Sequence, residues 1–185
     1  GHDRALLPQP DRASTMDLSC AAPAAVPGLA SAYAAAAAAL PAYLTGHGYF
    51  PLGLPELREA IADRYRRRGL PTSSDQVLVT SGAIAAIAAA AQALLGPGDR
   101  VLVESPVYPN AVTSLRRAGA RVVAVPVDPD GWDLDAMEAS LRQAAPRAAY
   151  LIPDYQNPTG LLLNDDQRDR LGAALARART VAIVD

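Results

Sequence analysis

The chain has no lysine, because all 17 of its basic residues are arginine. A reaction that requires a lysine side chain therefore cannot be completed by these residues alone. Cysteine is almost missing as well: Cys20 is the only one, which excludes an internal disulfide and a cysteine-rich metal site. A single cysteine also fits a reducing environment, so we expect a cytoplasmic protein.

Histidines and large aromatic residues are scarce. His2 and His47 are the only histidines, which excludes a multi-histidine metal centre. Phe and Trp each occur once, although 50% of the 185 residues are hydrophobic, so the core must be aliphatic and rich in alanine. The formal net charge of -2 gives no electrostatic reason to expect nucleic acid or an anionic membrane as a partner.

Charge is also missing from Ala21 to Pro55, a stretch dominated by alanine and interrupted by prolines. The prolines rule out the continuous apolar run of about 20 residues that would span a membrane. The mixed charges before Ala21 do not match the basic start of a signal peptide. We expect residues 1–50 to form a linker and an N-terminal arm. The apolar part of the arm runs from Ala21 to Tyr49. The lack of charge there is expected if the arm packs on another surface, and we therefore predict a dimer.

Hydrophobic periodicity in residues 51–185 predicts strands that alternate with helices. The expected strands are Gln76–Thr80, Arg100–Glu104, Arg121–Val127, Tyr150–Ile152 and Thr180–Val184. The expected helices are Leu29–Leu40, Glu56–Arg68, Ala83–Leu95, Asn110–Ala118, Leu134–Ala144 and Asp165–Arg179. This alternation predicts an α/β fold with a largely parallel sheet covered by helices on both faces.

Several local features refine this prediction. Asp133 and Asn164 are suitable N-caps for the helices that follow them. The nearly all-apolar helix Ala83–Leu95 is expected to be buried on every side. The last strand reaches Asp185 with no helix after it, so we expect the chain to be part of a longer protein.

Polar residues follow the predicted strands at the edge where α/β sheets usually bind ligands. Ser81 and Gly82 begin an apolar helix, whose free N–H groups favour a phosphate. Tyr108 could stack on a flat ring, Asn157 in "QNPTG" is an amide donor, and Asp185 supplies a carboxylate. Each signal is weak alone, since Asn-Pro-Thr-Gly is also an ordinary turn sequence. Together they match the groups of pyridoxal phosphate.

The same segments resemble the class I/II aminotransferases, which are pyridoxal-phosphate enzymes of fold type I. The stretch "GYFPLGLPELREAIADRYRRRGLPTSSDQVLVTSGA", then "GPGDRVLVESPVYPNA" and "PDYQNPTG", is similar to the aminotransferase-like domain of the bacterial MocR group of GntR-type regulators. The resemblance covers roughly residues 16–185. It implies a three-layer αβα large domain, of which 51–185 would be the N-terminal part.

The resemblance also implies roles for single residues. Ser81, Gly82 and Ala83 would hold the cofactor phosphate, Ala83 through its backbone N–H because it lacks the hydroxyl of many relatives. Tyr108 would stack on the pyridine ring, and Asn157 would hydrogen-bond its phenolic oxygen. Asp185 would pair with the ring nitrogen and keep it protonated. Tyr49 would reach the phosphate of a neighbouring subunit.

Two functions remain open at this point. The first is amino-group transfer between amino acids and 2-oxo acids, for which the family needs a Schiff-base lysine that this chain lacks. The chain alone should therefore be inactive. The second is an effector-sensing domain of a transcription regulator, in which this segment would not itself bind DNA. A nucleotide-binding domain is disfavoured because no glycine-rich phosphate loop follows any strand.

The prolines of the two loops carry a further prediction. Asn157–Pro158 and Ser105–Pro106 both lie just past a strand at the proposed ligand edge, and relatives often have cis prolines at the matching places. We expect both peptide bonds to be cis, although only about 5–6% of such bonds are cis in folded proteins.

Overall fold

The computed structural model describes residues 24–185. Cys20, His2 and the start of the predicted arm lie outside the described residues. The chain divides into two compact units, Gly1–Pro51 and Leu52–Asp185. The first unit contains the helix α1 (Leu29–Ala39), which has no buried residue, and a short 3-10 helix at Leu40–Tyr43. Within it the rings of Tyr43 and Phe50 meet edge to face, with centroids 6.4 Å apart.

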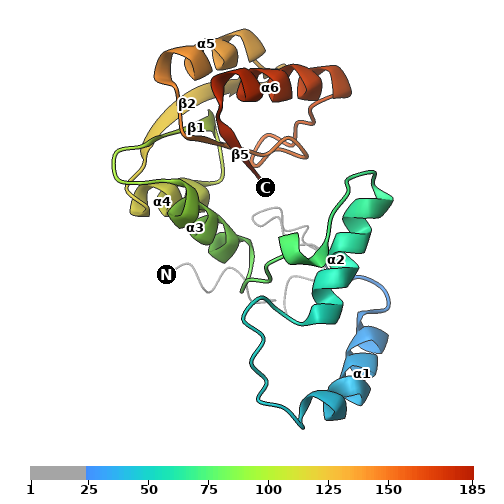
Figure 1. The fold of residues 1–185 in the computed structure, drawn as a ribbon. Helices are drawn as coiled ribbons and strands as arrows, with labels where there is room; N and C mark the ends of the chain where they lie inside the picture. Colours follow the sequence, from blue (N-terminus) through green and yellow to red (C-terminus); the bar gives the residue numbers. More distant parts are fainter. Residues whose placement is uncertain (1–23) are drawn as a thin grey trace, which may run out of the picture. The chain divides into compact units, whose positions relative to one another are not determined.

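The second unit is built around a five-stranded sheet with the order β3-β2-β1-β4-β5. Figure 1 labels β1, β2 and β5 of this sheet. Its strands are β1 (Arg100–Ser105), β2 (Arg121–Asp128), β3 (Gly131–Trp132), β4 (Ala148–Leu151) and β5 (Val181–Val184). The pairs β1–β2, β1–β4 and β4–β5 are parallel, and β2–β3 is antiparallel. The predicted α/β fold with a largely parallel sheet is therefore confirmed.

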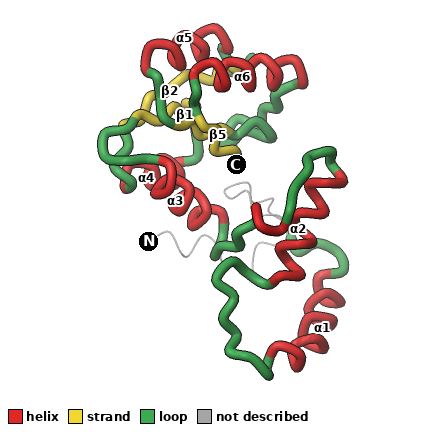
Figure 2. Tube along the Cα trace, in the orientation of Figure 1, coloured by secondary structure: helices red, strands yellow, loops and turns green. Residues whose placement is uncertain are grey.

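Helices cover both faces of the sheet, as Figure 2 shows. On one face, α3 (Ala83–Leu94) and α4 (Pro109–Arg117) enclose a core that includes Ile87, Leu115 and Tyr150. On the other face, α5 (Leu134–Ala144) and α6 (Asp165–Ala178) enclose a core that includes Met137 and Leu171. Strand residues alternate between these two cores, as the pleat requires. The predicted three-layer αβα arrangement is confirmed.

The predicted caps of α5 and α6 are present. The Asp133 side chain accepts a hydrogen bond of 2.9 Å from the N–H of Ala136. Asn164 and Gln167 form a reciprocal capping box, in which each side chain accepts a bond from the other residue's backbone N–H. These contacts satisfy N–H groups that the first turn of a helix leaves free.

The amino-terminal edge of the sheet is lined by arginines that cap helix ends. Arg100 begins β1, and its Nη1 donates to the carbonyl of Ala144, the last residue of α5, at 2.8 Å. Arg147 precedes β4, and its Nε donates to the carbonyl of Leu94, the last residue of α3, at 3.2 Å. A cation at a helix C-terminus also interacts favourably with the helix dipole. One helix on each face is thus tied to the sheet by an arginine.

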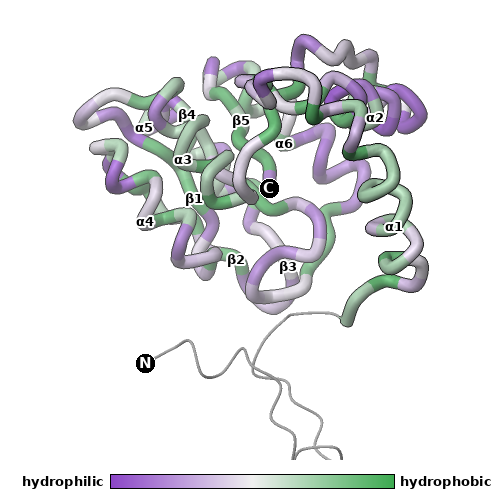
Figure 3. The backbone as a smooth tube through the Cα atoms, turned by 90° about the horizontal axis from the view of Figure 1, so that it is seen from below, coloured by the Kyte–Doolittle hydropathy of each residue, from purple (hydrophilic) through white to green (hydrophobic). Residues whose placement is uncertain are grey.

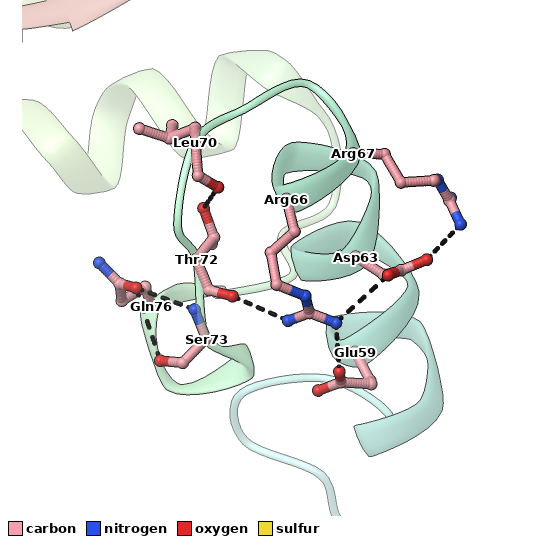
Figure 4. A network of polar contacts seen from close by, with 8 residues as sticks. All are labelled: Glu59, Asp63, Arg66, Arg67, Leu70, Thr72, Ser73 and Gln76. Atoms are coloured by element: carbon pink, nitrogen blue, oxygen red, sulfur yellow. Dashed lines mark hydrogen bonds and ion pairs between the residues drawn. The ribbon is translucent and has the colours of Figure 1, made fainter.

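The helix α2 (Pro55–Arg67) is polar along much of its length, in contrast to the alanine-rich α1 (Figure 3). Figure 4 shows how its basic end is engaged: Arg66 pairs with Glu59 at 2.7 Å and donates to the carbonyl of Thr72 at 2.8 Å. Arg67 pairs with Asp63. Hydrogen bonding to Arg66 lowers the pKa of Glu59. Because these groups are exposed, the ion pairs contribute little to stability. They mainly engage the arginine side chains in contacts with α2 and the loop that follows it.

Two predictions about elements are wrong, and one element was missed. Residues 77–80 form no strand: the Val79 N–H donates to Leu52 O, and the carbonyl of Val77 accepts a bond from Arg58, so no described strand pairs with them. The helix α3 is not buried on every side, because Ile84 is 47% exposed. The short strand β3 was not predicted, since its pairing with β2 depends on a two-residue turn.

Among residues 24–185, no helix is both long and apolar enough to cross a membrane.

Candidate functional site

The candidate residues after β1, β4 and β5 share one edge of the sheet. Because these three strands are parallel, their carboxyl ends lie on the same side. Tyr108 follows β1 and is the N-cap of α4. Asn157 lies in the loop after β4, and Asp185 directly follows β5. The topology therefore brings these three candidates to one edge, as predicted.

Asp185 is held by the neighbouring strand through both its backbone and its side chain. Its N–H donates to the carbonyl of Leu151 at 3.0 Å, and its carboxylate accepts a hydrogen bond from the hydroxyl of Tyr150. Tyr150 is opposite Ile183 in the register, so Asp185 lies two residues further along on the same face. That diagonal is within reach of an aromatic side chain.

The Tyr150 hydroxyl is set up to donate. Burial raises the pKa of Tyr150 well above its ordinary value, and the hydrogen bond to Asp185 raises it further. The phenol thus keeps its proton and directs it at the carboxylate of Asp185. Tyr150 was not among the predicted site residues.

Tyr108 and Asn157 differ in how firmly they are held. Tyr108 is partly buried, packs against the core that contains Tyr150, and accepts a hydrogen bond of 2.8 Å from Asn110 Nδ2. The Asn157 side chain is exposed. The peptide bonds Ser105–Pro106 and Asn157–Pro158 are both cis, so that prediction is confirmed.

Two buried polar residues, Glu104 and Gln156, connect the loops that carry Tyr108 and Asn157. Gln156 Nε2 donates to the Glu104 carboxylate at 3.2 Å and to the carbonyl of Pro106 at 2.7 Å. Neither residue was among the predicted site residues. A signal was present: strand alternation places Glu104 on the same face as Leu102, which predicts a buried carboxylate in need of donors.

The predicted phosphate cradle forms the start of α3. Gly82 is the N-cap with φ 110° and ψ 167°, a conformation that favours glycine, and Ala83 is the first helical residue. No side chain caps this helix end. Thr80 Oγ1 instead donates to the carbonyl of Gly82 at 3.1 Å, which leaves the N–H groups of the first turn to other acceptors. Ser81 and Gly82 are exposed.

Tyr49 belongs to the first unit, where its side chain is 78% exposed. Its role at a neighbouring subunit stays a prediction.

Two surface hollows are present in the second unit. One, of about 410 Å³, lies between α5 and α6, and the other, of about 450 Å³, lies at the amino-terminal edge of the sheet. Neither is lined by a candidate residue.

The fold resembles that of solved pyridoxal-phosphate enzymes. An α-aminoadipate aminotransferase from Thermus thermophilus, solved with N-(5'-phosphopyridoxyl)-L-leucine, is 34% identical with a TM-score of 0.69. The similarity covers 83% of this chain and 40% of that one. A Thermus thermophilus aspartate aminotransferase mutant is 30% identical with a TM-score of 0.75, over 83% of this chain and 42% of that one.

The match to the family described as "Aminotransferase class I and II" spans residues 25–185. The chain therefore belongs to this family, and the predicted resemblance is confirmed. A 2-aminoadipate transaminase from Thermus thermophilus is 38% identical over 60% of this chain and 28% of its own length. An uncharacterized HTH-type transcriptional regulator, YdcR of Escherichia coli K12, is 36% identical over 73% of this chain and 29% of its own length. The chain spans less than a third of either relative.

Proposed function

We propose that residues 51–185 form the N-terminal part of the pyridoxal-phosphate-binding large domain of an aminotransferase, and that residues 1–50 are a linker and arm. The intact protein would transfer amino groups between amino acids and 2-oxo acids. Because this chain has no lysine, the transfer is proposed for a protein that supplies one elsewhere.

The observation that carries the proposal is the pairing of Tyr150 with Asp185. A carboxylate fixed by a buried phenol at the carboxyl edge of a parallel sheet is suited to hold a protonated ring nitrogen. The nearby negative charge of the carboxylate would keep the nitrogen protonated. Bound pyridoxal phosphate would then act as an electron sink for carbanion chemistry at the substrate.

The other residues fit the remaining parts of the cofactor. The uncapped start of α3 offers backbone N–H groups and the positive end of the helix dipole to a phosphate, at Ser81, Gly82 and Ala83. Tyr108 would stack on the ring, and Asn157 would donate to its phenolic oxygen. These residues bind and orient the cofactor, and none of them transfers the substrate proton.

We also propose that the intact protein is a cytoplasmic homodimer. The described helix α1 is alanine-rich and has no buried residue, and Tyr33 in it is 69% exposed. Covering such an apolar surface with a second copy would lower the free energy, because apolar groups would leave water. Tyr49 would then reach the cofactor phosphate of the partner subunit. A well-folded monomer of the intact protein in light scattering would contradict this arrangement.

Cofactor binding and amino transfer can be tested on the intact protein. Titration with pyridoxal phosphate should give a saturable absorbance change, and an amino acid with a 2-oxo acid should give the exchanged products. The variant Asp185→Ala should weaken cofactor binding strongly, whereas Asp154→Ala, which removes an exposed surface pair with Arg168, should not. Equal binding by both variants would refute the assignment of Asp185.

A second function is favoured by one specific observation. Similar sequences include regulators as well as aminotransferases, for example a probable rhizopine catabolism regulatory protein of Rhizobium meliloti that is 36% identical over 70% of this chain. In that case the same site would bind pyridoxal phosphate and sense an effector. An intact protein that binds the cofactor and a DNA operator, but gives no exchanged products, would favour regulation.

A further inference from the structure

Glu104 is a buried carboxylate that contacts hydrogen-bond donors. It is 1% exposed, and its partners among the described residues are Trp132 Nε1 at 2.8 Å, the N–H of Ile152 at 3.2 and 3.3 Å, and Gln156 Nε2 at 3.2 Å. Burial raises the pKa of Glu104, while these hydrogen bonds oppose the rise. A protonated acid would direct its own hydrogen at one of these donors, so the geometry favours the ionised form.

Gln156 is equally buried, at 1% exposed, and its side-chain amide is fully engaged. Its Nε2 donates to Glu104 and to the carbonyl of Pro106, while its Oε1 accepts from the N–H and the hydroxyl of Thr159, at 3.0 and 2.7 Å. Turning the amide over would face its NH₂ toward the Thr159 N–H and its oxygen toward two acceptors. The amide therefore has a single favourable orientation.

These contacts join the two candidate loops through one side chain. Pro106 is two residues before Tyr108, and Gln156 directly precedes Asn157. The backbone of Gln156 is fixed as well, because its N–H donates to Leu161 O at 2.8 Å and its carbonyl accepts from the Gly160 N–H. A shift of either loop would leave buried polar atoms without partners, which costs more free energy than an ordinary hydrogen bond contributes.

We propose that Glu104 and Gln156 are positioning residues of the cofactor site, which fix the Tyr108 loop and the Asn157 loop relative to each other. The inference rests on the proposed function, because it assumes that Tyr108 and Asn157 contact pyridoxal phosphate. Glu104 acts through Gln156, and Gln156 acts through the two loops. Neither touches the cofactor. A role in folding alone is the competing explanation, so the test must separate loop position from stability.

The chain offers a matched control for this purpose. Gln156→Met removes the amide but keeps a side chain of similar length. Trp132→Phe removes another donor from the same carboxylate, yet Trp132 lies on β3 and in neither loop. Both variants leave Glu104 short of one donor. Gln156→Met alone should disturb the loops.

The experiment uses the intact protein and measures the dissociation constant of pyridoxal phosphate together with the circular dichroism of the bound cofactor, which reports how its ring is held. Gln156→Met should weaken binding on the order of 10- to 100-fold and change the dichroism band. Trp132→Phe should leave both within about twofold, an effect too small to reflect a lost positioning contact.

Other outcomes would overturn the inference. Normal cofactor binding by Gln156→Met, or an equal loss in Trp132→Phe, would show that the network only supports folding. If Gln156→Met does not fold, Thr159→Val tests the same point, since it removes one of the two donors that orient the amide; unchanged binding and dichroism would again overturn the inference. An intact wild-type protein that binds no pyridoxal phosphate would instead refute the proposed function, and the inference with it.

Discussion

The hydroxyl of Tyr150 donates a hydrogen bond to the carboxylate of Asp185 across β4 and β5. Tyr150 is 0% exposed and Asp185 is exposed, so a rigid core residue orients a carboxylate at the surface of the sheet edge. The buried residue thus limits the rotamers that the exposed one can adopt. The role of the Asp185 carboxylate can therefore be tested by changing Tyr150, which need not touch any ligand.

We expect Tyr150→Phe to weaken binding of pyridoxal phosphate by the intact protein about tenfold, since a hydrogen bond to a charged group contributes roughly 1.5–3 kcal/mol and 1.4 kcal/mol is tenfold. Absorbance titration measures the effect. Tyr65→Phe is the control, because Tyr65 is 44% exposed on α2. Equal affinity in the two variants would show that Asp185 is positioned without the phenol.

The buried Glu104 predicts a pH dependence of stability. Burial raises its folded-state pKa above the ordinary value of 4.5, so between these two values the folded protein binds more protons than the unfolded one. The contribution of Glu104 to the free energy of unfolding therefore falls as pH rises from 4.5 through the folded pKa, by at most about 1.4 kcal/mol per pH unit.

Urea unfolding at a series of pH values measures this contribution. Other carboxylates also titrate, and the lowered pKa of Glu59 acts in the opposite direction, so the useful quantity is the difference between wild type and Glu104→Gln. That difference should shrink as pH rises through the window, because the variant has no proton to lose. Parallel profiles would mean that Glu104 has the same pKa folded and unfolded.

Gly53 should tolerate no side chain. Its φ is +99°, and a Cβ added to it would overlap the side chain of Val79. Gly69 is a matched control with φ +87° and no atom within 4 Å of its added Cβ. We expect Gly53→Ala to cost about 1–3 kcal/mol more than Gly69→Ala in urea unfolding, the typical cost of overpacking. Equal costs would indicate that residues 77–80 move aside.

Removal of the α6 cap should have a modest and specific cost. Asn164→Ala loses the acceptor for the Gln167 N–H and should lower the free energy of unfolding by about 1 kcal/mol. Asn164→Asp keeps the acceptor and adds a charge that the helix N-terminus favours, so it should retain full stability. A loss of similar size in both variants would place the effect elsewhere than in the cap.

Features that depend on neighbours in the chain could be predicted from the sequence. The caps at Asp133 and Asn164 need a side chain and an N–H three residues apart, and the apolar strands are recognisable by their composition. Residues 77–80 have the same composition, but a strand also needs a partner, and the described sheet provides none. A local sequence pattern does not show whether a partner strand is present.

The candidate site shows the same division. Tyr108, Asn157 and Asp185 follow strands, so the topology was enough to bring them to one edge. Gln156 could not be predicted, because its importance arises from a contact with Pro106, which is 50 residues away in sequence. Trp132 is similar: its N–H reaches Glu104 across 28 residues, from a strand that the sequence did not reveal.

The two ends of the sheet have different roles: arginines at the amino-terminal edge hold helices to the sheet, and the loops at the carboxyl edge carry the candidate site residues. Arg100 and Arg147 fasten one helix of each layer at that edge, far along the strands from the loops that carry Tyr108 and Asn157. Loop sequences at the carboxyl edge can therefore diverge while the anchorage of the layers is preserved. The attachment of these two helices to the sheet thus involves no residue of the loops proposed to hold the cofactor, whether the intact protein transfers amino groups or senses an effector.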